Sequence, residues 1–121
     1  MSAPRRKIDR RLLGTWKSDA RRTFKDWIFP PELSEKKRKR FKKLFGKLTL
    51  HYTPSRIISD YRGERQIKHY EVLGKDSGSV AILSWSSDRR TAEIDHIRFQ
   101  GQHYWILTIA GQMEFFKRVR R

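Results

Sequence analysis

From residue 47 onward, apolar and polar residues alternate in short runs that are separated by turn-forming residues. In the first run, residues 47–53, Leu48, Leu50 and Tyr52 share one face and polar residues occupy the other. A period of two is typical of a β-strand that buries one face. The same pattern predicts strands at residues 56–61, 66–73, 79–85, 91–99, 103–109 and 113–119. The links are too short for parallel crossovers, so the pattern predicts an antiparallel meander.

The residues before the meander predict a tail, one strand and a helical segment. Residues 1–11 are basic and polar and are interpreted as a flexible tail, which leaves residues 12–121 as a single domain. Residues 13–18 suit a short first strand. Residues 20–29 fit a short helix that Asp19 would cap, although their apolar spacing also fits a strand.

Residues 34–45 predict a second helix. Ser34 is a suitable N-cap, and Gly46 is a suitable stop in the left-handed conformation. The apolar stripe of this segment is narrow, and most of its other positions are Lys or Arg. Such a helix can cover one mouth of a barrel and present its basic face to solvent.

Eight antiparallel strands in sequence order can curl into a closed barrel, which removes exposed sheet edges. Closure requires the first strand to pair with the last one. Trp16 is a large side chain that can hold this junction, and Gly14 permits close backbone approach. The sequence therefore predicts an all-β, up-and-down barrel of about eight strands, with one or two short helices after the first strand.

The Gly14-x-Trp16 motif, the helices behind it and the meander resemble the lipocalin and fatty-acid-binding protein (calycin) superfamily, as a small bacterial-type lipocalin-like domain. The resemblance implies that Trp16 closes the barrel floor and that a basic residue of the last strand packs across its ring. Arg118 stands at the matching place, with Arg120 as the other candidate. Fatty-acid-binding proteins also carry an Arg-x-Tyr pair in the last strand, which grips the ligand carboxylate. Here Arg118 is followed by Val119 and Arg120, so the resemblance implies the fold more than a fatty-acid ligand.

Charge adds a second candidate feature to this picture. The net charge is +16, and residues 1–43 hold 16 of the 29 basic residues but 5 of the 13 acidic residues. This imbalance predicts attraction of anionic partners. A dense basic run is a candidate for contact with nucleic acid or another anion: Lys36, Lys37, Arg38, Lys39, Arg40, Lys42 and Lys43. The alternative is a solvated helix face.

The chain has no Cys, which excludes disulfides and thiolate metal sites. The start of the sequence has no apolar stretch of the length that a signal peptide needs, and no transmembrane run follows. A cytoplasmic protein is therefore expected, and the sequence leaves its oligomeric state open.

An eight-stranded barrel has room for packed side chains or for one small ligand. Strand aromatics are the candidates for lining such a cavity, and the alternative is that they fill it: Tyr52, Tyr70, Trp85 and Trp105. The leading hypothesis is a non-enzymatic binding protein that holds a small amphipathic ligand, with an anionic ligand as one option. The alternatives are a nucleic-acid-binding module that uses the basic N-terminal third, or a protein-interaction domain that docks to an acidic protein.

Little in the sequence suggests catalysis or metal binding, and no cofactor is expected. Glu93 and Asp95 share one strand face, where two carboxylates could do acid–base work if buried. We expect them instead to face solvent and to pair with Arg98 or Lys68. The sequence has no nucleophile elbow, phosphate loop or recognisable triad. The histidines fall on predicted strands without local ligand spacing, which favours ordinary surface positions: His51, His69, His96 and His103.

Overall fold

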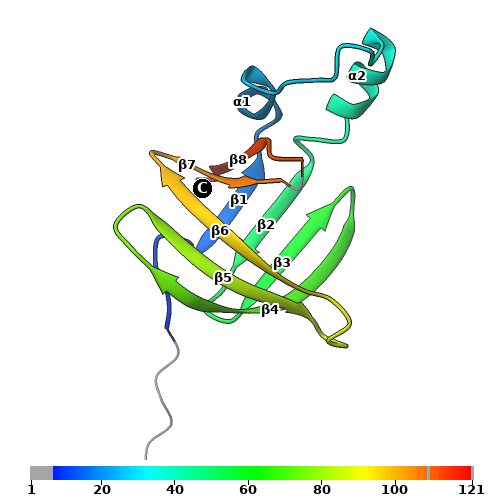
Figure 1. Cartoon of the computed structure of the whole chain (residues 1–121). Helices are drawn as coiled ribbons and strands as arrows, with labels where there is room; N and C mark the ends of the chain where they lie inside the picture. The colour runs from blue at the N-terminus through cyan, green and yellow to red at the C-terminus, as the bar shows by residue number, and fades with distance from the viewer. Residues whose placement is uncertain (1–6, 109, 121) are drawn as a thin grey trace, which may run out of the picture.

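The structure is a computed structural model that describes residues 7–108 and 110–120. Eight antiparallel strands form a closed barrel (Figure 1). The strands are β1 (Gly14–Ser18), β2 (Leu48–Tyr52), β3 (Arg56–Tyr61), β4 (Glu64–Lys75), β5 (Ser79–Ser86), β6 (Ala92–Gln100), β7 (His103–Leu107) and β8 (Met113–Arg118). Two short helices, α1 (Ala20–Lys25) and α2 (Glu35–Lys42), follow β1. The predicted fold class is confirmed; residue 109 of the predicted seventh strand lies outside the described residues.

Alternate residues of each strand point into the barrel, because successive side chains of a strand face opposite sides. On β5, Val80, Ile82 and Ser84 are buried while the residues between them are more exposed. The buried apolar cluster draws on β1 to β8 and on the segment before β1, and its largest members are Trp16, Tyr70 and Tyr104. Burial of such aromatic area is the main favourable contribution to folding in a domain of this size.

The junction of β1 and β8, which we call the seam, is held by Trp16 and Arg118. Trp16 is 1% exposed and lies opposite Arg118 in the ladder. The guanidinium carbon of Arg118 lies 4.2 Å from the centre of the indole ring. The guanidinium also donates to the main-chain oxygens of Leu13, at 2.9 Å, and of Arg11. The indole N–H donates to the main-chain oxygen of Leu12 at 2.9 Å, so both side chains of the seam pair are hydrogen-bonded to the main chain before β1.

Gly14 is required by the same junction. Its φ of +111° lies in the region that side chains disfavour, and a Cβ there would stand 3.1 Å from the Nη1 of Arg118. Arg120, the other sequence candidate, is exposed. Arg118 is therefore the basic residue that packs across Trp16.

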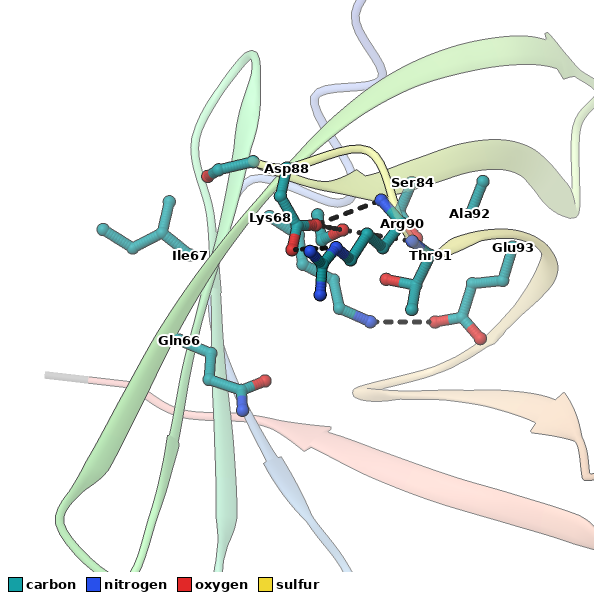
Figure 2. A pocket seen from close by; sticks show the side chains of 11 residues that line it. Gln66, Ile67, Lys68, Ser84, Asp88, Arg90, Thr91, Ala92 and Glu93 are labelled. Carbon is teal, nitrogen blue, oxygen red and sulfur yellow. Dashed lines mark hydrogen bonds and ion pairs between the residues drawn. The ribbon is translucent and has the colours of Figure 1, made fainter.

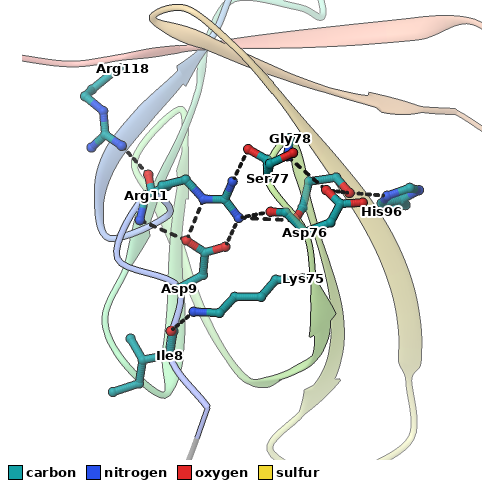
Figure 3. A network of polar contacts seen from close by, with 10 residues as sticks. Ile8, Asp9, Arg11, Lys75, Asp76, Ser77, Gly78, His96 and Arg118 are labelled. Carbon is teal, nitrogen blue, oxygen red and sulfur yellow. Dashed lines mark hydrogen bonds and ion pairs between the residues drawn. The ribbon is translucent and has the colours of Figure 1, made fainter.

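The end of the barrel at the link between β4 and β5, which we call the floor, is connected to the segment before β1 by Arg11 (Figure 3). The Arg11 guanidinium donates to the Asp9 carboxylate, with a shortest distance of 2.6 Å, and to the main-chain oxygens of Asp76, Ser77 and Ser79. Burial alone would raise the pKa of Asp9, but the hydrogen bonds and charge of Arg11 outweigh it and hold that pKa below its ordinary value. Residues 9–11, predicted as part of a flexible tail, therefore pack on the floor; residues 1–6 lie outside the described residues.

The helix α1 is docked on the barrel. Its N-cap Asp19 accepts from the main-chain N–H of Arg22 at 3.0 Å and lies 2.9 Å from the Nε2 of His103 on β7. The hydroxyl of Thr23 accepts from the main-chain N–H of Phe115 on β8 at 2.9 Å. The helical interpretation of residues 20–29 is thus confirmed for its first part, because the Asp19 cap satisfies the first turn.

The helix α2 stands away from the ring of strands (Figure 1). Ser34 caps it as predicted, but the helix ends at Lys42 and none of its residues is buried. Five rings join α2 to α1, with centres 4.9–6.4 Å apart in contacting pairs, and we call them the aromatic cluster: Phe24, Trp27, Phe29, Phe41 and Phe45. Neither helix has the length and apolar character that crossing a membrane demands, within the described residues.

Candidate functional site

The barrel holds a cavity of about 340 Å³ at the end opposite the floor. An eight-stranded barrel is just wide enough for its side chains to fill it, so a cavity of this volume means that the filling is incomplete. The apolar part of the wall comes from β2, β3, β6, β7 and β8: Leu48, Leu50, Ile57, Ile97, Ile106 and Phe116. This wall can take the apolar part of a small molecule.

Two buried tyrosines form the inner end of the cavity. The hydroxyls of Tyr52 and Tyr104 lie 2.7 Å apart, and the side chains are 4% and 1% exposed. Burial raises the pKa of both Tyr52 and Tyr104, so both phenols stay neutral near neutral pH. The Tyr104 ring centre lies 4.7 Å from that of Trp16. The seam therefore supports the bottom of the cavity directly.

The outer half of the cavity carries charged side chains from three strands. These are Lys68 on β4 and three acidic residues, which we call the cavity carboxylates: Glu93, Asp95 and Glu114. Lys68 reaches Glu93 with an N···O distance of 3.4 Å. Burial and then the neighbouring Glu93 raise the pKa of Asp95, against a smaller lowering by Lys68. Burial also raises the pKa of Glu114. The cavity therefore combines an apolar wall with an acidic outer half.

The position of Asp95 corrects a prediction made from the sequence. Glu93 pairs with Lys68, as expected, but Asp95 faces the cavity and not open solvent. Arg98, the other expected partner, lies on the outer face of β6, where its guanidinium carbon stands 4.6 Å from the Trp105 ring centre. The alternating strand pattern correctly predicted that Glu93 and Asp95 share one face of β6, but it did not indicate that this face points into the barrel.

An open groove of about 810 Å³ leads from the cavity to solvent (Figure 2). Cavity and groove share residues of β4, β5 and β6, among them Lys68, Ser84 and Glu93. Figure 2 shows the Lys68 amine reaching toward Glu93. Farther out, Arg90 and Asp88 form a wider ion pair at 3.7 Å. The groove is therefore the entrance through which a small molecule would reach the cavity.

The four aromatic residues predicted to line a cavity occupy different places. Tyr52 lines it. Tyr70 is buried at the floor side, donates to the main-chain oxygen of Thr53 at 2.5 Å, and is absent from the cavity wall. Trp85 and Trp105 lie on the outer faces of β5 and β7, because each is one residue away from an inward-facing position. The prediction that Trp85 and Trp105 line a cavity is wrong.

Ser84 and Glu114 are among the lining residues that were not singled out from the sequence. Each stands two residues from a buried apolar side chain, Ser84 from Ile82 and Glu114 from Phe116. The strand period of two therefore indicates that Ser84 and Glu114 face the barrel interior. A polar residue in an inward-facing register position of an otherwise apolar strand marks the wall of a cavity.

The expected helical lid is absent from the described part of the chain, since no residue of α1 or α2 lines the cavity or the groove. The aromatic cluster holds α2 beyond the strands, so the basic run does not supply charge to the cavity. Within that run, Arg38 donates to the main-chain oxygen of Leu33 at 2.9 Å and packs on Phe29. No carboxylate among the described residues forms an ion pair with any of the seven basic side chains.

The four histidines are dispersed over the outside of the barrel. His51 contacts the Thr15 hydroxyl at 2.8 Å, and His96 contacts the Ser79 hydroxyl at 2.9 Å. His69 stacks on the Trp85 ring. Across residues 7–108 and 110–120, no three His, Cys, Asp or Glu residues are grouped in a way that would hold a metal ion.

Comparison of the chain with protein-family models, with curated proteins and with solved structures finds no significant match. The closed eight-stranded antiparallel barrel is consistent with a calycin-like fold.

Proposed function

We propose that this protein is a non-enzymatic binding protein of the lipocalin-like kind, which holds a small amphipathic molecule inside its barrel. The observation that carries the proposal is the cavity of about 340 Å³ with an open entrance. Small-molecule sites are typically concave, largely apolar and roughly 300–1,000 Å³ in volume, with a few polar groups that fix orientation. The apolar wall and the charged outer half supply these two kinds of contact.

The charges around the cavity favour one orientation of the ligand. Its apolar part would lie between Leu50, Ile97 and Phe116, and its polar part would lie in the outer half among the cavity carboxylates. The sequence left an anionic ligand as one option. Three carboxylates against one lysine, which is already paired with Glu93, make a negative charge unfavourable there. We therefore propose a ligand that is not an anion.

A fluorescence titration with the uncharged probe N-phenyl-1-naphthylamine tests the binding role. We expect saturable binding to the wild-type protein because the probe is apolar and small. Replacing Ile106 with Trp fills the cavity and should weaken binding by at least about tenfold. The matched control is Leu107→Trp, since Leu107 is the next residue of β7 and is 54% exposed. Thermal unfolding verifies that both variants fold. Absence of saturable binding, or equal binding by the two folded variants, would contradict the proposal.

A second candidate function is supported by α2. The six exposed basic side chains around it have no acidic partner among the described residues, and the helix projects from the barrel. Such a free cationic surface suits a polyanion, either nucleic acid or an acidic protein. The packing of the aromatic cluster around α1 argues against stacking on exposed bases, so this binding would be mainly electrostatic.

Salt dependence tests this second candidate. We expect oligonucleotide binding to weaken steeply as salt rises, because each phosphate contact adds about 0.9 to the slope of log K against log salt for duplex DNA. Changing Lys36, Lys37, Lys39 and Arg40 to Gln should lower that slope by about 2–4. A control with an equal charge change elsewhere on the surface carries Gln at Arg56, Arg65, Lys117 and Arg120. No binding at low salt excludes a nucleic-acid role, and a lysate partner retained after nuclease treatment favours an acidic protein.

A further inference from the structure

The cavity contains negative charge that this chain does not neutralise. Lys68 engages Glu93 at 3.4 Å. Asp95 and Glu114 line the same cavity, and their side chains have neither an ion pair nor a hydrogen bond with any residue in the described ranges. Both side chains are half-buried. Carboxylates in such surroundings are normally paired, because an unpaired buried charge is costly.

Ser84 is a second, independent observation at the same place. It is 1% exposed, it lines both the cavity and the entrance groove, and its hydroxyl has no hydrogen-bond partner among the residues described. No side-chain nitrogen or oxygen among the described residues is sealed from solvent without a hydrogen-bond partner, so the unpartnered Ser84 hydroxyl opens into the cavity. A ligand with an N–H donor in the outer half of the cavity would satisfy the Ser84 oxygen together with the two unpaired carboxylates.

We propose that the cavity selects a cationic amphiphile, an apolar molecule that carries a protonated amine. This inference rests on the proposed binding function and adds the chemical class of the ligand. The ammonium group lies in the outer half of the cavity, whose wall Asp95, Glu114 and Ser84 all line, and the apolar part extends toward the wall formed by Leu50 and Phe116. A primary ammonium has three donors, which matches these three acceptors.

The net charge of +16 does not oppose this selection. Charges on the outer surface act through solvent and are screened over about 10 Å at moderate salt, whereas contacts inside a cavity are screened much less. The nearest cationic side chain of the wall, Lys68, is paired with Glu93, and Arg90 in the groove is paired with Asp88. The local carboxylates therefore decide which ligand charge the cavity accepts.

Three probes with the same tail and different head groups separate this inference from the binding function. We expect octylamine to bind at least about tenfold more tightly than octanol, and octanoate to bind most weakly, in calorimetric titrations at pH 7. Octanol or octanoate binding as tightly as octylamine would overturn the charge selection and leave the binding function intact. Failure of all three probes to bind would overturn both.

Matched variants test which groups hold the ammonium. Asp95→Asn and Glu114→Gln should each weaken octylamine binding by about tenfold and change octanol binding by less than about twofold. Glu71→Gln is the control, because Glu71 is exposed on the outer face of β4. An equal loss of octanol and octylamine binding would contradict the proposal, since it would show that the carboxyl group acts through the shape of the cavity.

The pH dependence of octylamine binding gives a further readout. Burial and the neighbouring Glu93 raise the pKa of Asp95, and burial raises the pKa of Glu114, so both take up protons at a higher pH than exposed carboxyls do. The other ionisable groups facing them are Glu93, Lys68 and the two phenols at the cavity bottom. Burial raises the pKa of those phenols, which therefore stay neutral. Octylamine affinity should fall as pH drops through the raised carboxyl pKa values; a flat profile in this range would overturn the proposal.

Discussion

Replacing Trp16 with alanine is expected to lower the free energy of unfolding by about 3–5 kcal/mol, the usual range for deleting a buried large aromatic side chain. Trp16 is 1% exposed, its N–H bonds the Leu12 oxygen, and its ring supports Tyr104 at the bottom of the cavity. The deletion leaves a void where the first and last strands meet. Urea unfolding followed by circular dichroism measures the change.

The control for the Trp16 variant is a tryptophan on the outer face. Trp85 is partly exposed and stacks on His69, so Trp85→Ala should cost about 1 kcal/mol. A Trp16→Ala variant that is no less stable than the Trp85→Ala variant would show that Trp16 does not hold the seam.

Replacing Arg118 with methionine is expected to lower the free energy of unfolding by about 2–4 kcal/mol. Methionine retains much of the apolar length of arginine, but it removes the charge over the Trp16 ring and the two donors. The main-chain oxygens of Arg11 and Leu13 then lose their hydrogen bonds inside the floor. Arg118→Lys keeps the charge but loses the planar guanidinium, so the stability of this variant should lie between those of the wild-type protein and the Arg118→Met variant.

Arg120→Met is the matched control, since Arg120 is exposed two residues farther along the chain. It should change the unfolding free energy by less than about 0.5 kcal/mol. In a double-mutant cycle, Trp16→Ala and Arg118→Met should be less costly together than the sum of the single changes, because each removes the same contact. Additive effects would contradict a direct interaction between the two side chains.

The strands of this barrel could be predicted from the sequence because turns and alternation act locally. The eight predicted strands recur in the structure with boundaries shifted by a few residues, and the Asp19 and Ser34 caps set the starts of the helices. Barrel closure predicts that the first strand meets the last. The Trp16–Arg118 contact itself was implied by the resemblance of the Gly14-x-Trp16 motif to the calycin superfamily.

The candidate site could be predicted less well because alternation assigns residues to two faces without saying which face points inward. On β6, Asp95 and Ile97 share the inward face, whereas charge normally marks the solvent side. Trp85 and Trp105 were expected inside the barrel because their side chains are large and apolar. Their positions in the strand register place both on the outer face. The position of α2 also depends on packing between rings far apart along the chain, which no local pattern records.

The seam has a consequence for how the chain reaches its native state. Residues of β1 pair with residues of β8, and a seam hydrogen bond joins positions 105 residues apart. Bringing such distant segments together costs conformational entropy before any contact between them forms. This cost slows folding. During synthesis, the indole of β1 is made long before Arg118 on β8 and stays without that partner until β8 follows. The barrel cannot close until the eighth strand has left the ribosome, so until then the nascent sheet has two unpaired edges.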